Sequence, residues 1–212
     1  MADKTVADLP NDAPTSASLF EHTNAVGNSR HCTGTQLKSY AGGGETVIST
    51  TTTASSAASV TISSIPGTYR HLKLRVFGRS NLAGADNDTI LLQFNGDTAS
   101  NYTWNRDGAA DAGSAFTSGS TSATAITAAY IPAATSTAGF AGIMEMLIPF
   151  YTNTTFKKTG WGGNTGKGGG GVYQMNIGWS WASTSAITSI LVDLPGSNTF
   201  VDGTIVELIG IA

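Results

Sequence analysis

One glycine-rich segment, residues 161–168 (WGGNTGKG), has several residue types of a phosphate-binding loop. In that motif, glycine amides and a lysine surround the phosphates, a Ser or Thr after the lysine binds magnesium, and a helix follows. Here Trp161 stands at the first glycine position, and Gly168 stands where the hydroxyl is required. More glycine follows in place of a helix-forming sequence. We therefore do not predict nucleotide binding, and we expect a mobile hairpin tip.

A second group of residues has the oxygen ligands that calcium prefers, namely Asp86, Asn87, Asp88 and Asp97. Their spacing does not match a calcium-binding loop of the EF-hand type, and the closing glutamate is absent. Asp and Asn side chains also stabilise turns by bonding to the nearby backbone. We expect turns here and no metal.

Histidine and cysteine do not form a recognisable site either. His22, His31 and His71 lack the spacing of metal ligands, and Cys32 is the only cysteine of the chain. A single cysteine can form neither an intrachain disulfide nor a zinc site based on several cysteines. No cofactor is expected.

Carboxylates that could act in acid–base catalysis are few. Glu45, Glu145 and Glu207 lie in expected strands, but no sequence signature pairs them across a scissile bond, as glycoside hydrolysis requires. Such pairs assemble only in space, so a glycosidase remains an open alternative. We predict that the chain is not an enzyme.

Aromatic residues are the better candidates for binding. Tyr102, Trp104, Trp161, Trp179 and Trp181 lie near expected loops or strand ends, where exposed rings can stack on sugar faces. Trp179 and Trp181 are two residues apart and share one face of their strand. For this pair, packing in the core or between subunits is the favoured interpretation.

The composition favours strands and argues against nucleic-acid binding. Only 12% of the 212 residues are charged, 26 are glycine, and Ser and Thr are abundant. Such chains form pleated strands joined by turns. The net charge of -3 and the dispersed basic residues give no electrostatic surface for nucleic acid. The densest basic group is predicted to decorate one solvated face: Arg70, Lys73, Arg75 and Arg79.

Alternating hydrophobic segments recur at the spacing of a β-sandwich or barrel. They cover residues 60–62, 72–77, 90–94, 140–150, 172–181, 187–194 and 204–211, whereas residues 107–124 are expected to form a long surface loop. We predict an all-β protein with an antiparallel, jelly-roll-like β-sandwich. Both faces of the segment 140–150 are apolar, which favours cover by a neighbouring subunit, and we expect a homotrimer.

The chain is expected to have three parts. Residues 1–44 would form a short, mixed attachment segment with a short helix near 35–40, residues 45–59 a Thr/Ser-rich linker or edge strand, and residues 60–212 the sandwich. About forty residues cannot bury much surface alone. The first part should therefore dock on another protein through its hydrophobic residues, and the candidates are Leu9, Leu19, Phe20, Leu37 and Tyr40.

The sequence has no apolar signal-peptide core near its first residues and no apolar stretch of membrane-spanning length. We therefore expect a protein that is made in a host cytoplasm, is not inserted in a membrane, and is released by lysis.

Several ordered motifs resemble a family of tailed-bacteriophage virion proteins, often described as tail-fibre or receptor-binding proteins. They are residues 64–74 (SIPGTYRHLKL), 79–80 (RS), 92–97 (LQFNGD), 100–102 (SNY), 186–190 (AITSI) and 206–211 (VELIGI). The segments 6–10 (VADLP), 19–22 (LFEH) and 34–40 (GTQLKSY) are similar to openings that attach fibres to particles, although residues 28–32 depart from that pattern.

This resemblance implies a non-enzymatic structural protein of the virion. Its N-terminus would bind other tail or capsid proteins, and its sandwich would face outward to attach to the host surface, where glycan is an expected ligand. Two alternatives stay open. One is a head-fibre or capsid decoration protein with the same fold, and the other is a stand-alone carbohydrate-binding module.

Overall fold

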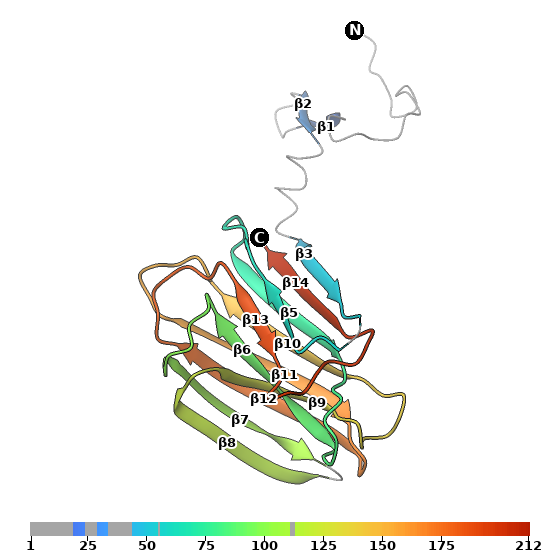
Figure 1. The fold of residues 1–212 in the computed structure, drawn as a ribbon. Coiled ribbons are helices and arrows are strands. Elements are labelled where there is room, and N and C mark those ends of the chain that lie inside the picture. Colours follow the sequence, from blue (N-terminus) through green and yellow to red (C-terminus); the bar gives the residue numbers. More distant parts are fainter. Residues whose placement is uncertain (1–18, 24–28, 34–43, 55, 111–112) are drawn as a thin grey trace, which may run out of the picture. The chain divides into compact units, whose positions relative to one another are not determined.

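The structure is a computed structural model that describes residues 19–23, 29–33, 44–54, 56–110 and 113–212 (Figure 1). The chain divides into two compact units, Met1–Gly44 and Glu45–Ala212. The described residues form strands and turns but no helix. Accordingly, no helix in the described ranges is long and apolar enough to cross a membrane.

The described part of the first unit is a pair of short strands. β1 (Leu19–Thr23) runs antiparallel to β2 (Ser29–Thr33). Of the predicted attachment residues, Leu19 and Phe20 lie on β1. Leu9, Leu37, Tyr40 and the predicted helix near 35–40 lie outside the described residues. Attachment through this unit stays a prediction.

The second unit is an antiparallel β-sandwich, which confirms the predicted fold class (Figure 1). The large sheet has eight strands in the order β3 (Glu45–Thr52), β14 (Ile205–Ile211), β5 (His71–Gly78), β10 (Gly142–Pro149), β11 (Lys158–Lys167), β12 (Val172–Trp181), β7 (Tyr102–Ala110) and β8 (Ser114–Ala123). The small sheet has four, in the order β4 (Ser59–Ile62), β13 (Ile190–Asp193), β6 (Asn87–Phe94) and β9 (Ile126–Pro132).

The core lies between the two sheets and follows from the alternation of the strands. Successive side chains point to opposite faces, so residues two apart share a face. Fully buried apolar residues come from both sheets, namely Leu72, Leu74 and Val76 on β5, Met144, Met146 and Ile148 on β10, and Ile90, Leu92 and Phe94 on β6. Burial of each such side chain contributes about 1.5–3 kcal/mol relative to exposure.

The segment 140–150 is only partly as predicted. Its inward face is correct for Met144, Met146 and Ile148, but β10 ends at Pro149. Phe140 and Phe150 lie beyond the strand and are 46% and 51% exposed. The predicted strand 140–150 is therefore too long at both ends.

One segment that was predicted as a loop is a strand pair, and a second adopts the strand form of its two predicted alternatives. Most of residues 107–124 belongs to the β7–β8 pair, because the small side chains of β8 leave its backbone free to bond with β7. Residues 45–52 form β3 at the edge of the large sheet, which is the edge-strand alternative. The sandwich unit therefore begins at Glu45 rather than at residue 60.

The glycine-rich segment 161–168 was also misread as a hairpin tip, since most of it lies within β11. Its glycines make room for aromatic rings of β12. A Cβ atom on Gly160 would collide with the Trp179 ring, and one on Gly166 would collide with the Tyr173 phenol. The turn comes later, where the Gly168 N–H donates to the Gly171 carbonyl at 2.9 Å. The glycines that make this segment resemble a phosphate-binding loop therefore serve the packing of β11 against β12.

A polar turn connects the two sheets where β6 ends and β7 follows. Asn95 and Gly96 have φ values of 54° and 67°, the left-handed region that Gly and Asn tolerate best. The Asp97 carboxylate accepts hydrogen bonds from Trp181 Nε1 at 2.7 Å and from Asn101 Nδ2 at 2.9 Å. The Tyr102 hydroxyl donates to the Asp97 carbonyl at 3.0 Å. This turn thus binds side chains of β7 and β12.

The Asn95 side chain extends the same turn to the segment that leads into β13. Its Oδ1 accepts from the backbone N–H groups of Thr188 and Ser189 at 2.8 and 3.1 Å, and its Nδ2 donates to the Ala186 carbonyl at 2.8 Å. Three of the motifs that carry the family resemblance, residues 92–97, 100–102 and 186–190, therefore meet in one hydrogen-bonded junction. We call Asn95, Asp97, Asn101, Tyr102 and Trp181 the junction.

We predict that Asp97→Ala lowers the free energy of unfolding by about 1–3 kcal/mol, because the buried Trp181 N–H loses its acceptor. Urea denaturation at neutral pH measures the change. Asp202→Ala, at an exposed carboxylate, is the control and should have little effect.

The effect should also depend on pH. Hydrogen bonds from Asn101 and Trp181 hold the pKa of Asp97 below its usual 3.8. A carboxyl group whose pKa is lower in the folded state than in the unfolded state stabilises the fold at pH values above its unfolded-state pKa. This stabilisation is lost as the pH falls through the folded-state pKa. The difference in the free energy of unfolding between the wild type and Asp97→Ala should therefore become smaller at acid pH. A constant difference at every pH would contradict this role of the carboxylate.

Candidate functional site

The large sheet has one face turned away from the core, and we call it the outer face. It consists of the side chains that alternate with the buried ones, such as Lys73 and Arg75 on β5 or Gln174 and Asn176 on β12. The pairing registers place these side chains in rows that run across the strands. The outer face has two halves of different chemistry.

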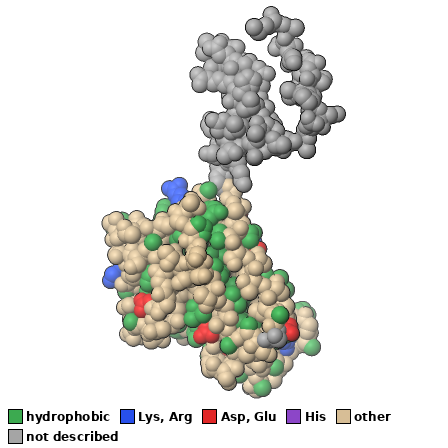
Figure 2. All heavy atoms as spheres, turned by 45° about the horizontal axis from the view of Figure 1, so that its top comes forward, with side chains coloured by type: hydrophobic (Ala, Val, Ile, Leu, Met, Phe, Trp, Pro, Cys, Tyr) green, Lys and Arg blue, Asp and Glu red, His purple; other side chains and the backbone are tan. Residues whose placement is uncertain are grey.

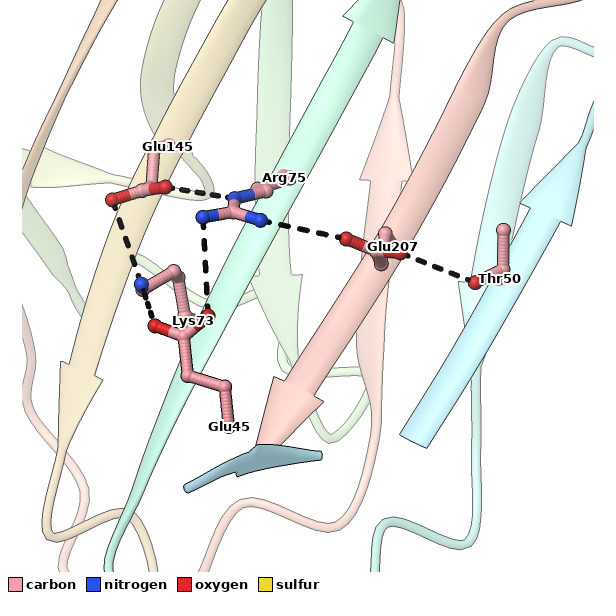
Figure 3. Close-up of polar contacts among 6 residues, drawn as sticks. All are labelled: Glu45, Thr50, Lys73, Arg75, Glu145 and Glu207. Carbon is pink, nitrogen blue, oxygen red and sulfur yellow. Dashed lines mark hydrogen bonds and ion pairs between the residues drawn. The ribbon is translucent and has the colours of Figure 1, made fainter. Parts of the chain in front are cut away.

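The first half, on β3, β14, β5 and β10, contains a network of five charges (Figure 3). Arg75 lies at its centre, where its Nε donates to Glu145 Oε2 at 2.8 Å. Its other nitrogens lie 3.8 Å from Glu207 and 4.0 Å from Glu45. Lys73 pairs with Glu45 and lies 4.0 Å from Glu145. We call these five residues the charge network.

The charge network favours the ionised form of the Glu45 carboxylate. The hydrogen bond from Lys73 is the largest cause that lowers the pKa of Glu45. The hydrogen bond to Glu145 raises the pKa of Arg75. A general acid at neutral pH needs the opposite, a carboxyl whose pKa is raised by burial or by a like charge. The geometry of this network therefore favours a structural role over catalysis.

Exposed apolar side chains flank the charged row. Ile205, Phe77 and Ile143 are neighbours on β14, β5 and β10. Val47 on β3 and Trp161 on β11 lie on the other side of the charges and are also exposed. By contrast, charged side chains are few and well separated on the side of the molecule that Figure 2 shows. The outer face thus combines exposed apolar groups with a paired cluster of three carboxylates and two cations.

The second half of the outer face is mostly polar around one ring. Trp161 is 64% exposed and pairs with Leu147 on β10 and with Gly178 on β12. Gly178 has open space where a side chain would stand. One row further lies a shallow depression of about 380 Å³ whose lining includes Ile143, Gly163, Thr165, Gln174 and Asn176. Amide and hydroxyl groups therefore lie close to an exposed indole.

Alternation along β12 explains why these groups share the surface. Gln174, Asn176 and Gly178 occupy exposed positions, whereas the residues between them fill the core. That pattern could have identified the amides from sequence, because β12 was predicted as a strand and its apolar face is clear. Selecting aromatic residues alone missed them.

The five predicted aromatic residues separate into three environments. Tyr102, Trp179 and Trp181 are at most 4% exposed and pack around Phe94 in the core. Their placement among surface candidates was wrong, and the packing interpretation of the Trp179–Trp181 pair is confirmed. Trp104 is half-buried, with the Arg106 guanidinium 5.1 Å from its ring centre. Trp161 alone among the five is an exposed ring.

The predicted basic group does not act as one solvated face. Lys73 and Arg75 lie in the charge network, but Arg79 turns to the loop after β9. There the Arg79 guanidinium donates to five backbone carbonyls within residues 133–140, at 2.7 to 3.2 Å. Arg79 is therefore a loop anchor, a role that no local sequence pattern indicates.

The predicted turn is confirmed at Asp97, whereas Asn87 and Asp88 lie within β6 and not in a turn. Asp97 belongs to the junction, and Asp88 accepts a hydrogen bond from Asn198 Nδ2 at 3.0 Å. Within the part of the chain that the structure describes, no three His, Cys, Asp or Glu side chains gather in an arrangement that could hold a metal ion.

Comparison with protein-family models, curated proteins and solved structures finds no match to this chain.

We predict that two arginines four residues apart differ in their effect on stability. Arg75→Met should change the free energy of unfolding by about 1 kcal/mol or less, because exposed ion pairs contribute little and salt screens them. Arg79→Met removes a cation that binds five carbonyls and should cost about 1–3 kcal/mol. Urea denaturation at low and high salt tests both. A larger loss for Arg75→Met would contradict our interpretation of the network.

Proposed function

We propose that this chain is a non-enzymatic structural protein of a tailed-bacteriophage particle and that its outer face attaches to host-surface glycan. The sequence motifs support the first part, because they resemble those of virion proteins. The second part is carried by one observation, an exposed Trp161 ring on the same face of the sheet as the amide groups of Asn176 and Gln174, which pair with positions two and four residues further along β11.

Trp161 suits a sugar because an indole offers a flat apolar surface to the C–H groups of a pyranose. The neighbouring Gly178 leaves space beside the ring, so a ligand can lie along the sheet. Thr165, Gln174 and Asn176 supply donors and acceptors for sugar hydroxyls. Because this surface is shallow and open, each site would bind weakly, and many copies on one particle would supply avidity.

Catalysis has no role in the proposal. The carboxylate that lines the depression belongs to Glu145, and Arg75 holds it by a charge-assisted hydrogen bond. The proposed function requires neither a cofactor nor a metal.

The exposed row of Ile205, Phe77 and Ile143 favours a second candidate function. A capsid decoration protein could bury this row against the shell, since apolar groups of this kind mark protein contacts. The two candidates place the chain at different ends of the particle.

We predict that Trp161→Ala abolishes glycan retention by the full chain on a glycan array. Phe156→Ala is the matched control, because Phe156 is an equally exposed ring outside the outer face and should be neutral. Thermal unfolding should change little in both variants. Equal binding by wild type and Trp161→Ala, or no binding by any form to any glycan, would refute the receptor role.

We further predict that gold-labelled antibodies against the chain mark the tail of intact particles in electron micrographs. Labelling spread over the capsid would select the decoration protein instead. If infectious particles carry no label at all, the virion assignment itself fails.

A further inference from the structure

We propose that β8 of one copy pairs antiparallel with β8 of a second copy, so that two large sheets join into one continuous sheet. This inference concerns assembly and is independent of the proposed glycan site. It rests on the backbone N–H and C=O groups that a sheet edge leaves unpaired, which can template another strand.

The described sandwich has four edges, and three of them are blunted by features that discourage pairing. β4 has only four residues, and β9 ends at Pro132, which lacks an N–H donor. β3 begins with the charged Glu45 and carries a bulge in its middle, where the register shifts between Leu208 and Ile209. Short length, proline, charge and bulges are the ordinary protections of an edge strand.

β8 lacks charge, proline and short length, and its one bulge lies near its C-terminal end, after Ser120. It has ten residues, none of them charged or proline, and only Phe116 has a large side chain. Its one register shift lies between Tyr102 and Trp104 of the partner strand, so β8 is regular from Ser114 to Ser120. Phe116 points to the core side and packs against Tyr130 with ring centres 5.9 Å apart. Seven regular residues, six of them with small side chains, therefore lie along an open edge.

The strand that best fits this edge is β8 of a second copy, rather than a strand of an unrelated protein. Two identical strands that pair antiparallel generate a twofold axis, the commonest symmetry of protein assemblies. Since β8 has no charge, no register of this pair places like charges opposite each other. The axis is perpendicular to the sheet, so both outer faces point the same way. The trimer expected from sequence cannot arise from this contact, because the contact is twofold.

The test is the oligomeric state of the full chain in sedimentation equilibrium over a range of concentrations. We expect a dimer for the wild type and at least a tenfold weaker association for Thr117→Lys/Ser118→Lys, which places two lysines of each copy in the middle of the proposed pair, where they repel the lysines of the other copy. The matched control is Thr52→Lys/Thr61→Lys, with lysines at exposed positions of β3 and β4. It should remain dimeric. Thermal unfolding of both variants reports whether the fold is retained.

A wild type that is monomeric at every concentration overturns the proposal. So does a trimer, or a dimer that the two β8 lysines leave unchanged.

Disulfide trapping gives a second measurement that does not depend on weakening the contact. In a Cys32→Ser background, single cysteines replace Thr117, Ser118 or Ser120. A disulfide needs Cα atoms about 4.4–6.8 Å apart, so only the position nearest the twofold axis should cross-link efficiently with its own copy. Thr52→Cys in the same background is the control. Equal cross-linking at all positions, including the control, indicates random collision and counts against a defined β8 pair.

Discussion

The sandwich depends on how the chain passes from one sheet to the other without leaving buried polar groups unpaired. At the junction, the Asp97 carboxylate accepts from the Trp181 indole, while the Tyr102 hydroxyl accepts from the Phe94 N–H at 2.9 Å and donates to the Asp97 carbonyl. An unpaired buried donor costs about 1–3 kcal/mol. One turn thus allows two large aromatic side chains to enter the core with their polar atoms bonded, and it fixes β6 relative to β7 and β12.

This constraint gives a physical meaning to the motifs that resemble a virion-protein family. Asn95 bonds to the segment before β13, and Tyr151 of the loop after β10 donates its hydroxyl to the Pro66 carbonyl. The motifs are distant in sequence and adjacent in space. They specify how strands meet, so a resemblance based on them concerns the fold more directly than any ligand.

The sequence predicted the architecture where alternation was strong and failed where side chains were small. β5 and β10 have apolar residues at every second position, so their inward faces were predictable. β8 consists largely of Ser, Thr, Gly and Ala, which do not distinguish strand from loop, and its state is decided by hydrogen bonds to β7. The exposure of Trp161 was likewise unpredictable from residue type. Trp161 alternates with glycines, and only the pairing of β11 with β12 shows which ring enters the core.

The candidate site, like the fold, could be predicted from the sequence only in part. Its exposed ring was among the candidates, but the amides of β12 and the gap at Gly178 become neighbours of that ring only through the register. The charge network is similar. Glu45, Lys73, Glu145 and Glu207 lie on four different strands, and no spacing along the chain indicates that they meet.

The glycines of β11 have a consequence for how this surface can diverge. On the core side, Gly160 and Gly166 accommodate rings of β12 and tolerate no side chain, so that face of the strand is fixed. On the outer face, the Trp161 ring is largely exposed, and its neighbour on β12 is Gly178. The surrounding residues therefore place little steric constraint on the side chain at this position. The core side of β11 therefore carries residues that are sterically constrained, and its outer side carries residues that can vary more freely. Substitutions can then accumulate on the outer face of β11 without disturbing the packing of the core.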